Sequence, residues 1–100
     1  MTQEDIKEKI IEAIEADPNK DCIKSISLFG SFLHGDAKEN SDVDLLVELR
    51  KRIGFFTLLG IQDNLAQKLG RKVDLLTKED LSKYYRDEVV REAKKIYQYD

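Results

Sequence analysis

The alternation of apolar and polar residues predicts three short β-strands. Residues 42–49 (DVDLLVEL) place apolar side chains at every second position over most of their length, and residues 23–29 (IKSISLF) place Ile26 and Leu28 on one face. Both patterns are typical of strands with one buried face. In the second run the polar face carries Asp42 and Asp44. Residues 71–76 (RKVDLL) repeat the Val-Asp-Leu-Leu pattern of the second run and therefore predict a third strand.

Apolar residues three or four positions apart predict helices before and between these strands. Residues 2–16 carry a stripe of isoleucines, and Asp17-Pro18 ends that helix. Residues 55–69 form a second amphipathic helix, with the Phe55-Phe56 pair placed in the core. Gly70 closes this helix as a left-handed cap.

Two further helical segments complete the predicted order of elements. A short helix over residues 31–35 follows the first strand, and a last helix spans residues 84–97, with an apolar side. Thr77, with Asp80 three residues later, resembles a capping box. The resulting order of helix, strand, helix, strand, helix, strand and helix predicts a small α/β (α+β) fold whose sheet is covered by helices. The apolar side of the last helix is made of Tyr85, Val89, Ala93, Ile96 and Tyr97.

Composition narrows the class of protein. The chain has 100 residues, of which 41% are hydrophobic and 37% charged, and its net charge is −3, so we expect one globular domain over residues 1–100 without an overall basic footprint for nucleic acid. No apolar run approaches the length needed to span a membrane. The single cysteine, Cys22, excludes an internal disulfide and fits a reducing, cytoplasmic location.

Asp42, Asp44 and Asp74 are the candidate metal ligands. Two carboxylates two positions apart on one strand face are about 7 Å apart at the backbone, so their side chains can converge on one cation or a close pair of cations. If the third strand lies beside the second, Asp74 adds a carboxylate on the same face. Hard oxygen ligands suit Mg²⁺. For Asp42 taken alone, a turn or capping role is an equal alternative.

Gly30-Ser31 forms a candidate phosphate cradle directly after the first strand. Gly-Ser is common in ordinary turns. If a helix starts at Ser31, however, its free N–H groups and the hydroxyl could hold the phosphates of a nucleoside triphosphate. His34 lies in the same segment, where it is either a solvated loop residue or a further phosphate contact.

These two motifs together resemble a known family. Gly30-Ser31, ten intervening residues and Asp42-Val43-Asp44 match the G-S-x10-D-x-D pattern of the polymerase-β-like nucleotidyltransferase superfamily. The short length and residues 52–77 are similar to the minimal nucleotidyltransferases, the MNT or MntA-type antitoxins that are paired with HEPN-domain toxins. The resemblance covers residues 23–97 and implies a mixed sheet of three to four strands.

The resemblance also implies an activity. Asp42, Asp44 and Asp74 would be catalytic and would hold two Mg²⁺ ions, while Gly30, Ser31 and His34 would bind ATP. The product would be an adenylylated hydroxyl, that of a tyrosine on a partner HEPN toxin ribonuclease, in a possible hetero-oligomer without membrane or direct nucleic-acid contact. The chain departs from many relatives in having Leu33-His34 where they carry Ala-Arg.

Two other functions stay open from the sequence. The protein could neutralise its partner by steric binding alone, and the Leu33-His34 departure is the only residue pattern that favours this. It could instead modify a small molecule, as an aminoglycoside nucleotidyltransferase does. That activity would need an acidic pocket from a further helical domain or from a dimer.

Overall fold

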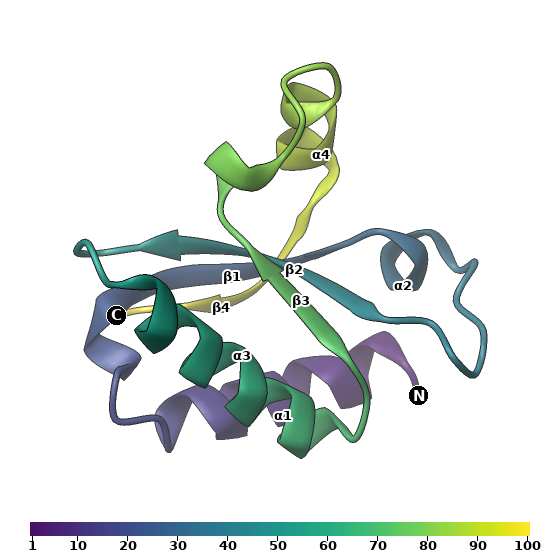
Figure 1. Cartoon of the computed structure of the whole chain (residues 1–100). Helices are drawn as coiled ribbons and strands as arrows, with labels where there is room; N and C mark the ends of the chain where they lie inside the picture. The colour runs from purple at the N-terminus through teal and green to yellow at the C-terminus, as the bar shows by residue number, and fades with distance from the viewer.

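The alternating strand runs build one four-stranded sheet in the computed structural model, which describes all 100 residues (Figure 1). The strand order is β3-β2-β1-β4. β1 pairs antiparallel with β2 and with β4, whereas β2 and β3 are parallel, so the sheet is mixed, as predicted. The elements are α1 (Gln3–Glu15), β1 (Ile23–Phe29), α2 (Ser31–His34), β2 (Val43–Leu49), α3 (Phe55–Leu69), β3 (Val73–Leu76), α4 (Arg86–Glu92) and β4 (Lys94–Gln98), with short 3-10 turns η1 (Lys20–Cys22) and η2 (Lys78–Asp80).

The core lies between one face of the sheet and helices α1 and α3, which run along that face (Figure 1). Each helix contributes a stripe at a spacing of four residues. The strands contribute the apolar face predicted from their alternation. The buried residues of these stripes are Ile6, Ile10 and Ile14 in α1, Ile61, Leu65 and Leu69 in α3, and Val43, Leu45, Val47, Val73 and Leu75 in β2 and β3.

Several predicted helix ends are confirmed by their hydrogen bonds. Thr2 and Asp5 form a capping box at the start of α1, and Gly70 ends α3 with φ +68°. Thr77 and Asp80 form the predicted capping box, in which the Thr77 N–H donates to Asp80 Oδ2 at 2.9 Å. Local sequence therefore decides where these elements begin and end.

The predicted last helix over residues 84–97 is wrong in its second half. The helix α4 covers only Arg86–Glu92, and the chain then continues as β4, paired antiparallel with β1. β1 would otherwise be an unpaired edge, and β4 satisfies its backbone groups while burying Ile96. Lys94 and Lys95 stay exposed on the new edge strand, where charges discourage further strand pairing.

The placement of Phe55 and Phe56 in the core is also wrong. They are 68% and 84% exposed, because the fully buried positions of α3 begin only at Ile61.

Residues 77–93, comprising η2 and α4, rise from the face of the sheet that lies opposite α1 and α3 (Figure 1). We call this segment the arm. It buries only Leu81, and Tyr84 is 88% exposed. No helix other than that of the arm lies over the middle of this sheet face (Figure 1), which we call the open face. None of the helices combines the length and the apolar character that a membrane-spanning segment requires.

Candidate active site

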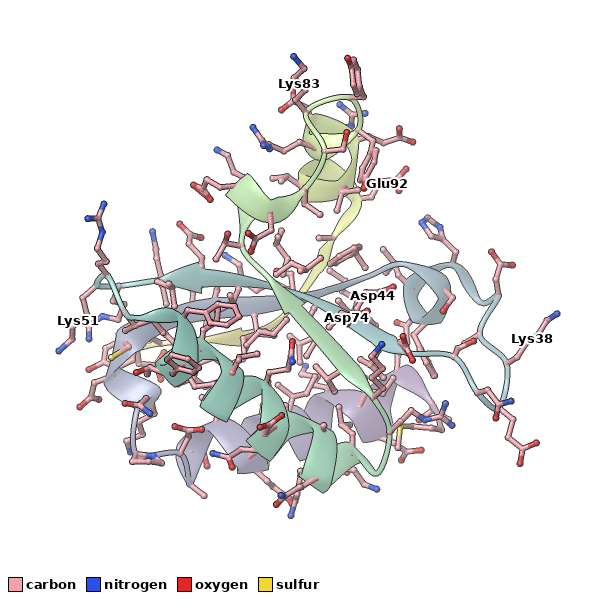
Figure 2. The ribbon with its side chains drawn as sticks, in the orientation of Figure 1. Lys38, Asp44, Lys51, Asp74, Lys83 and Glu92 are labelled. Carbon is pink, nitrogen blue, oxygen red and sulfur yellow. The ribbon has the colours of Figure 1, made fainter.

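The open face of the sheet carries three successive rows of side chains from β2 and β3. The parallel register aligns Asp44 with Asp74 and Leu46 with Leu76. One step earlier, Lys72 Nζ lies 3.7 Å from Asp42 Oδ2. Because side chains of a strand alternate between faces, these pairs follow one another along the strands as a charged row, a carboxylate row and an apolar row. The prediction that Asp74 stands beside Asp44 on a neighbouring strand is confirmed, and Figure 2 shows the two near the middle of the sheet.

Gly30 lies directly against the carboxylate row. It follows Phe29, which pairs with Asp44 across β1 and β2, and it adopts φ +76°. A Cβ at this position would lie 3.1 Å from Asp44 Cγ and closer still to Oδ2. Only glycine allows both the positive φ and this approach of the backbone to the carboxylate. The first residue of the Gly-Ser motif and the second Asp of the Asp-x-Asp motif thus meet in space.

The negative charges of the carboxylate row repel one another and lack a compensating positive charge. Burial raises the pKa of Asp44 above its ordinary value of 3.8, and the negative charges of Asp74 and Asp42 raise it further. Neither Asp44 nor Asp74 has an ion-pair partner. Half-buried carboxylates without a counter-charge repel one another, so this row is a place where a bound cation would be stabilised.

The carboxylates of Asp42, Asp44 and Asp74 suit a hard divalent cation, but they do not converge on a single point. No three His, Cys, Asp or Glu side chains converge closely enough to hold a metal ion, because Asp42 points to Lys72 while Asp44 stands beside Asp74. Oxygen ligands with incomplete protein coordination are typical of Mg²⁺ sites that substrate phosphates complete. Asp42, Asp44 and Asp74 are the residues that could hold such an ion.

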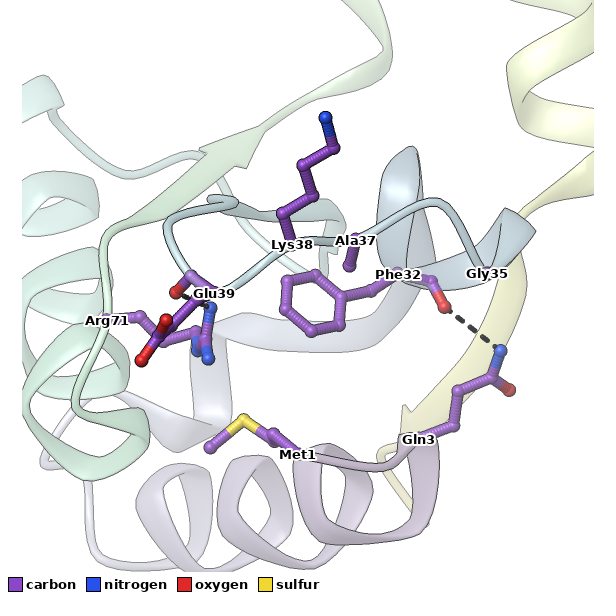
Figure 3. A pocket seen from close by; sticks show the side chains of 8 residues that line it. All are labelled: Met1, Gln3, Phe32, Gly35, Ala37, Lys38, Glu39 and Arg71. Atoms are coloured by element: carbon purple, nitrogen blue, oxygen red, sulfur yellow. Dashed lines mark hydrogen bonds between the residues drawn. The ribbon is translucent and has the colours of Figure 1, made fainter.

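Helix α2 and the following loop are held in place from outside the site (Figure 3). Gln3 Nε2 donates to the Phe32 and Leu33 carbonyl oxygens at 3.1 and 3.3 Å. Arg71 donates to the Glu39 and Ser41 carbonyl oxygens at 3.0 and 3.1 Å, and its guanidinium lies over the Phe32 ring. These contacts, from α1 and from the residue two positions before β3, hold α2 and the loop that follows it.

His34 contacts the arm. Its Nε2 lies 3.3 Å from Glu92 Oε2, so the residue at the end of α2 links this helix to α4. Sequence reasoning did not identify Glu92, nor the roles of Gln3 and Lys72. The only sequence signal for Lys72 was its position two residues before Asp74, which becomes informative once the register of β2 and β3 is known.

A comparison with protein families decides the identity of this fold. The family model of the polymerase beta nucleotidyltransferases matches residues 8–100. The chain belongs to this family. The nucleotidyltransferase is 36% identical to the protein adenylyltransferase MntA of Thermococcus cleftensis, in a match covering 71% of this chain and 72% of that protein.

Solved structures agree with this assignment. A structure of a candidate minimal nucleotidyltransferase superposes with a TM-score of 0.75 at 29% identity, covering 93% of this chain and 94% of the other. A toxin–antitoxin crystal structure with AMP-PNP gives a TM-score of 0.74 at 26% identity, covering 94% of this chain and 74% of the other. The predicted resemblance to minimal nucleotidyltransferases is confirmed. The four-stranded mixed sheet and its helices have the fold of these proteins.

Proposed function

We propose that this nucleotidyltransferase uses ATP to adenylylate a hydroxyl, that of a tyrosine, on a HEPN-type toxin ribonuclease and thereby acts as its antitoxin. The observation that carries the proposal is the close approach of Gly30 to Asp44, which lies beside Asp74 on the open sheet face without an ion-pair partner. The Gly30 turn, whose backbone can approach a phosphate, therefore lies next to carboxylates that suit Mg²⁺. The relative named MntA supports the adenylyl donor, and the toxin–antitoxin structure with AMP-PNP supports both the nucleotide and the class of partner.

Each motif residue has a defined role in this reaction. Gly30 and Ser31 hold the β- and γ-phosphates, with the Gly30 backbone placed against Asp44. Asp42, Asp44 and Asp74 would hold two Mg²⁺ ions, which when bound stabilise charge on the phosphate oxygens and lower the pKa of the acceptor hydroxyl. The acceptor oxygen attacks the α-phosphorus, the bond to the β-phosphate oxygen breaks, and pyrophosphate leaves. Asp74 accepts the hydroxyl proton as general base.

His34 and Lys72 are the two residues to which we assign contacts with the negatively charged phosphates. The family resemblance implies an arginine at the position of His34 in many relatives, and here the imidazole is engaged with Glu92. Lys72 lies in the first row, beside Asp42, and its ammonium is largely exposed. We assign Lys72 the role of a cation close to the phosphate chain and keep His34 as a weaker contact to the nucleotide.

Intact-mass spectrometry of a HEPN-domain ribonuclease, incubated with this protein, ATP and Mg²⁺, tests the proposal. We expect a gain of one or more AMP units. The Asp42→Asn, Asp44→Asn double variant, which keeps side-chain size while removing both charges, should give no gain. An equal gain with the double variant would refute the assigned site.

Steric neutralisation is the second candidate, and the His34–Glu92 contact is the observation that favours it, because it engages the side chain that stands in place of the arginine. If the double variant still suppresses ribonuclease activity, and the partner gains no mass with the wild type, steric binding is the function. A stable complex measured by size-exclusion chromatography would accompany that result.

A further inference from the structure

The three rows on the open sheet face give the transfer reaction a direction, if the proposed function holds. Gly30 lies next to Asp44, at the end of β2 where Asp42 and Lys72 form the first row. Phosphates bound there place the leaving pyrophosphate at that end. Attacking and leaving oxygens of a phosphoryl transfer lie roughly in line through the phosphorus. The acceptor must therefore arrive from the opposite side, over the third row.

A pocket of about 450 Å³ opens at that side. It lies between the later part of β2, the η2 turn and the arm helix α4. Leu46 of the third row lines it, and Thr77, which follows Leu76, lines its other wall. Val90 of α4 closes it from the arm, although this valine is 41% exposed and has no buried neighbour within its own helix. The full lining is Leu46, Val47, Glu48, Leu49, Thr77, Lys78, Glu79 and Val90.

The charges around this pocket are largely balanced. Glu48 is paired with Lys24, whose Nζ lies 3.2 Å from Glu48 Oε1. Lys78 and Glu79 bring one charge of each sign. The pocket therefore offers an apolar interior with a neutral rim, unlike the carboxylate row beside it. This environment does not suit a triphosphate or a cationic drug, but it suits a side chain with an apolar body.

We propose that this pocket is the acceptor subsite, and that it receives an aromatic hydroxyl side chain, a tyrosine, from an exposed segment of the partner protein. Strand geometry places Leu46 about 7 Å beyond Asp44. A tyrosine ring can lie against Leu46 and Val90 while its hydroxyl reaches the carboxylate row. A serine or threonine hydroxyl is too close to its backbone to do this from the same position. The new bond joins the phenolic oxygen to the α-phosphorus, pyrophosphate leaves toward the first row, and the proton passes to Asp74.

In this proposal the arm has a function in binding the acceptor. The arm buries little of its own surface, yet it places Val90 over the open sheet face. The contact between His34 and Glu92 ties the base of the arm to the helix that carries Ser31. The arm thus forms one wall of the acceptor subsite, and its position is linked to that of the phosphate cradle.

Val90→Arg tests the subsite, with Tyr84→Arg as its matched control. Both residues are exposed on the arm, so neither change disturbs the core, but only Val90 lines the pocket. The probe is the HEPN-domain ribonuclease with ATP and Mg²⁺. We expect Val90→Arg to raise the KM for the ribonuclease about tenfold or more, because the arginine charge would be buried against the incoming tyrosine ring. The affinity for a fluorescent ATP analogue should stay within about twofold for both variants, and Tyr84→Arg should transfer AMP as the wild type does.

Two results would overturn the subsite. One is unchanged transfer by Val90→Arg. The other is a parallel loss of nucleotide affinity, which would make the pocket a nucleoside site. Replacing the modified tyrosine of the probe by serine should abolish transfer to that position, and retained transfer would refute the requirement for an aromatic hydroxyl.

A crosslinking experiment separates failure of the subsite from failure of the proposed function. Val90 is replaced by the photo-reactive residue p-benzoylphenylalanine, and in a second protein Tyr84 is replaced in the same way. A crosslink from position 90 to a tyrosine-containing peptide of the probe supports the subsite even if the wild type transfers no AMP. Transfer without this crosslink overturns the subsite and leaves the proposed function standing. The absence of both overturns the two together.

Discussion

The two faces of β2 and β3 differ in what they contribute to the protein. On one face, Val43, Leu45, Val73 and Leu75 are buried against α1 and α3. On the other, Asp44 stands beside Asp74 with no counter-charge, and Leu46 lines an open pocket. Because side chains alternate, neighbouring residues of one strand serve stability and chemistry in turn. The packing of the core face therefore holds the strands in register although the opposite face is electrostatically unfavourable.

Replacing adjacent leucines gives the strongest test of this difference. Leu45→Ala removes a fully buried side chain and should lower the free energy of unfolding by about 2–5 kcal/mol. Leu46→Ala, one position along on the open face, should lower it by less than about 1 kcal/mol. Urea denaturation followed by circular dichroism measures both. Equal losses for the two variants would contradict the assignment of the faces.

A methyl group at Gly30 should damage the open face more than the core. Gly30→Ala places a Cβ against the Asp44 carboxylate and imposes φ +76° on a residue with a side chain. We expect a loss of about 1–3 kcal/mol in stability, together with a loss of AMP transfer. Gly35→Ala is a matched control, since it shares the positive φ at +78° but meets nothing within 4 Å. Calorimetry should show a loss from the positive φ in both variants and a larger loss for Gly30→Ala, which adds the contact with Asp44. The mass assay should show lost transfer only for Gly30→Ala.

The carboxylate row should make stability depend on pH in a specific direction. The pKa of Asp44 is raised by burial first and then by Asp74 and Asp42, so the folded protein binds this proton more tightly than the unfolded chain. The stabilising contribution is complete below the ordinary pKa of 3.8 and is lost as pH rises through the raised value. At pH 7 the ionised group destabilises the fold.

Asp44→Asn should therefore raise the melting temperature at pH 7. We expect a rise of at most a few degrees, because the carboxyl is only partly buried and solvent screens its repulsion. The gain should shrink toward zero as the pH falls below the ordinary pKa of 3.8, where the carboxyl is protonated in both the folded and the unfolded chain. Added Mg²⁺ should stabilise the wild type more than the variant. A variant that melts lower than the wild type at pH 7 would contradict the assigned electrostatics.

The smallest expected effect concerns the charged row. Lys72→Met keeps the length of the side chain and removes the cation beside Asp42. Because this ion pair is exposed, we expect almost no change in stability, at most about 0.5 kcal/mol. The dissociation constant for ATP with Mg²⁺ should rise about three- to tenfold, as measured by titration calorimetry. Lys68→Met, which removes a cation paired with Glu12 on the helical side, should leave nucleotide affinity unchanged.

Local patterns predicted much of this molecule correctly. β1 has the predicted bounds, and α1, β2 and α3 lie within a residue of theirs. Their periodicity and caps depend on neighbours within a few residues, so a single sequence contains that information. The pairing of Asp44 with Asp74 was also predictable, because two Val-Asp-Leu-Leu runs in parallel register bring identical positions together.

Other features depended on segments far apart in the chain. Residues 94–98 carry helix-compatible spacing, but the free edge of β1 recruits them as β4. Phe55 and Phe56 have the composition of a core, but the inward stripe of α3 starts later and leaves them in solvent. In both cases tertiary context overrides local propensity.

Residue type and short-range spacing specify the strands and helices near the two motifs. They also specify the chemical nature of Asp42, Asp44 and Asp74 and the glycine that precedes Ser31, so these features can be predicted from the chain alone. The folded chain adds contacts that residue type does not reveal: Gly30 with Asp44, Lys72 with Asp42, His34 with Glu92, and Val90 over the pocket that Leu46 lines. These contacts join segments that strand register and the packing of the whole sheet bring together, and no local stretch of the chain encodes them alone.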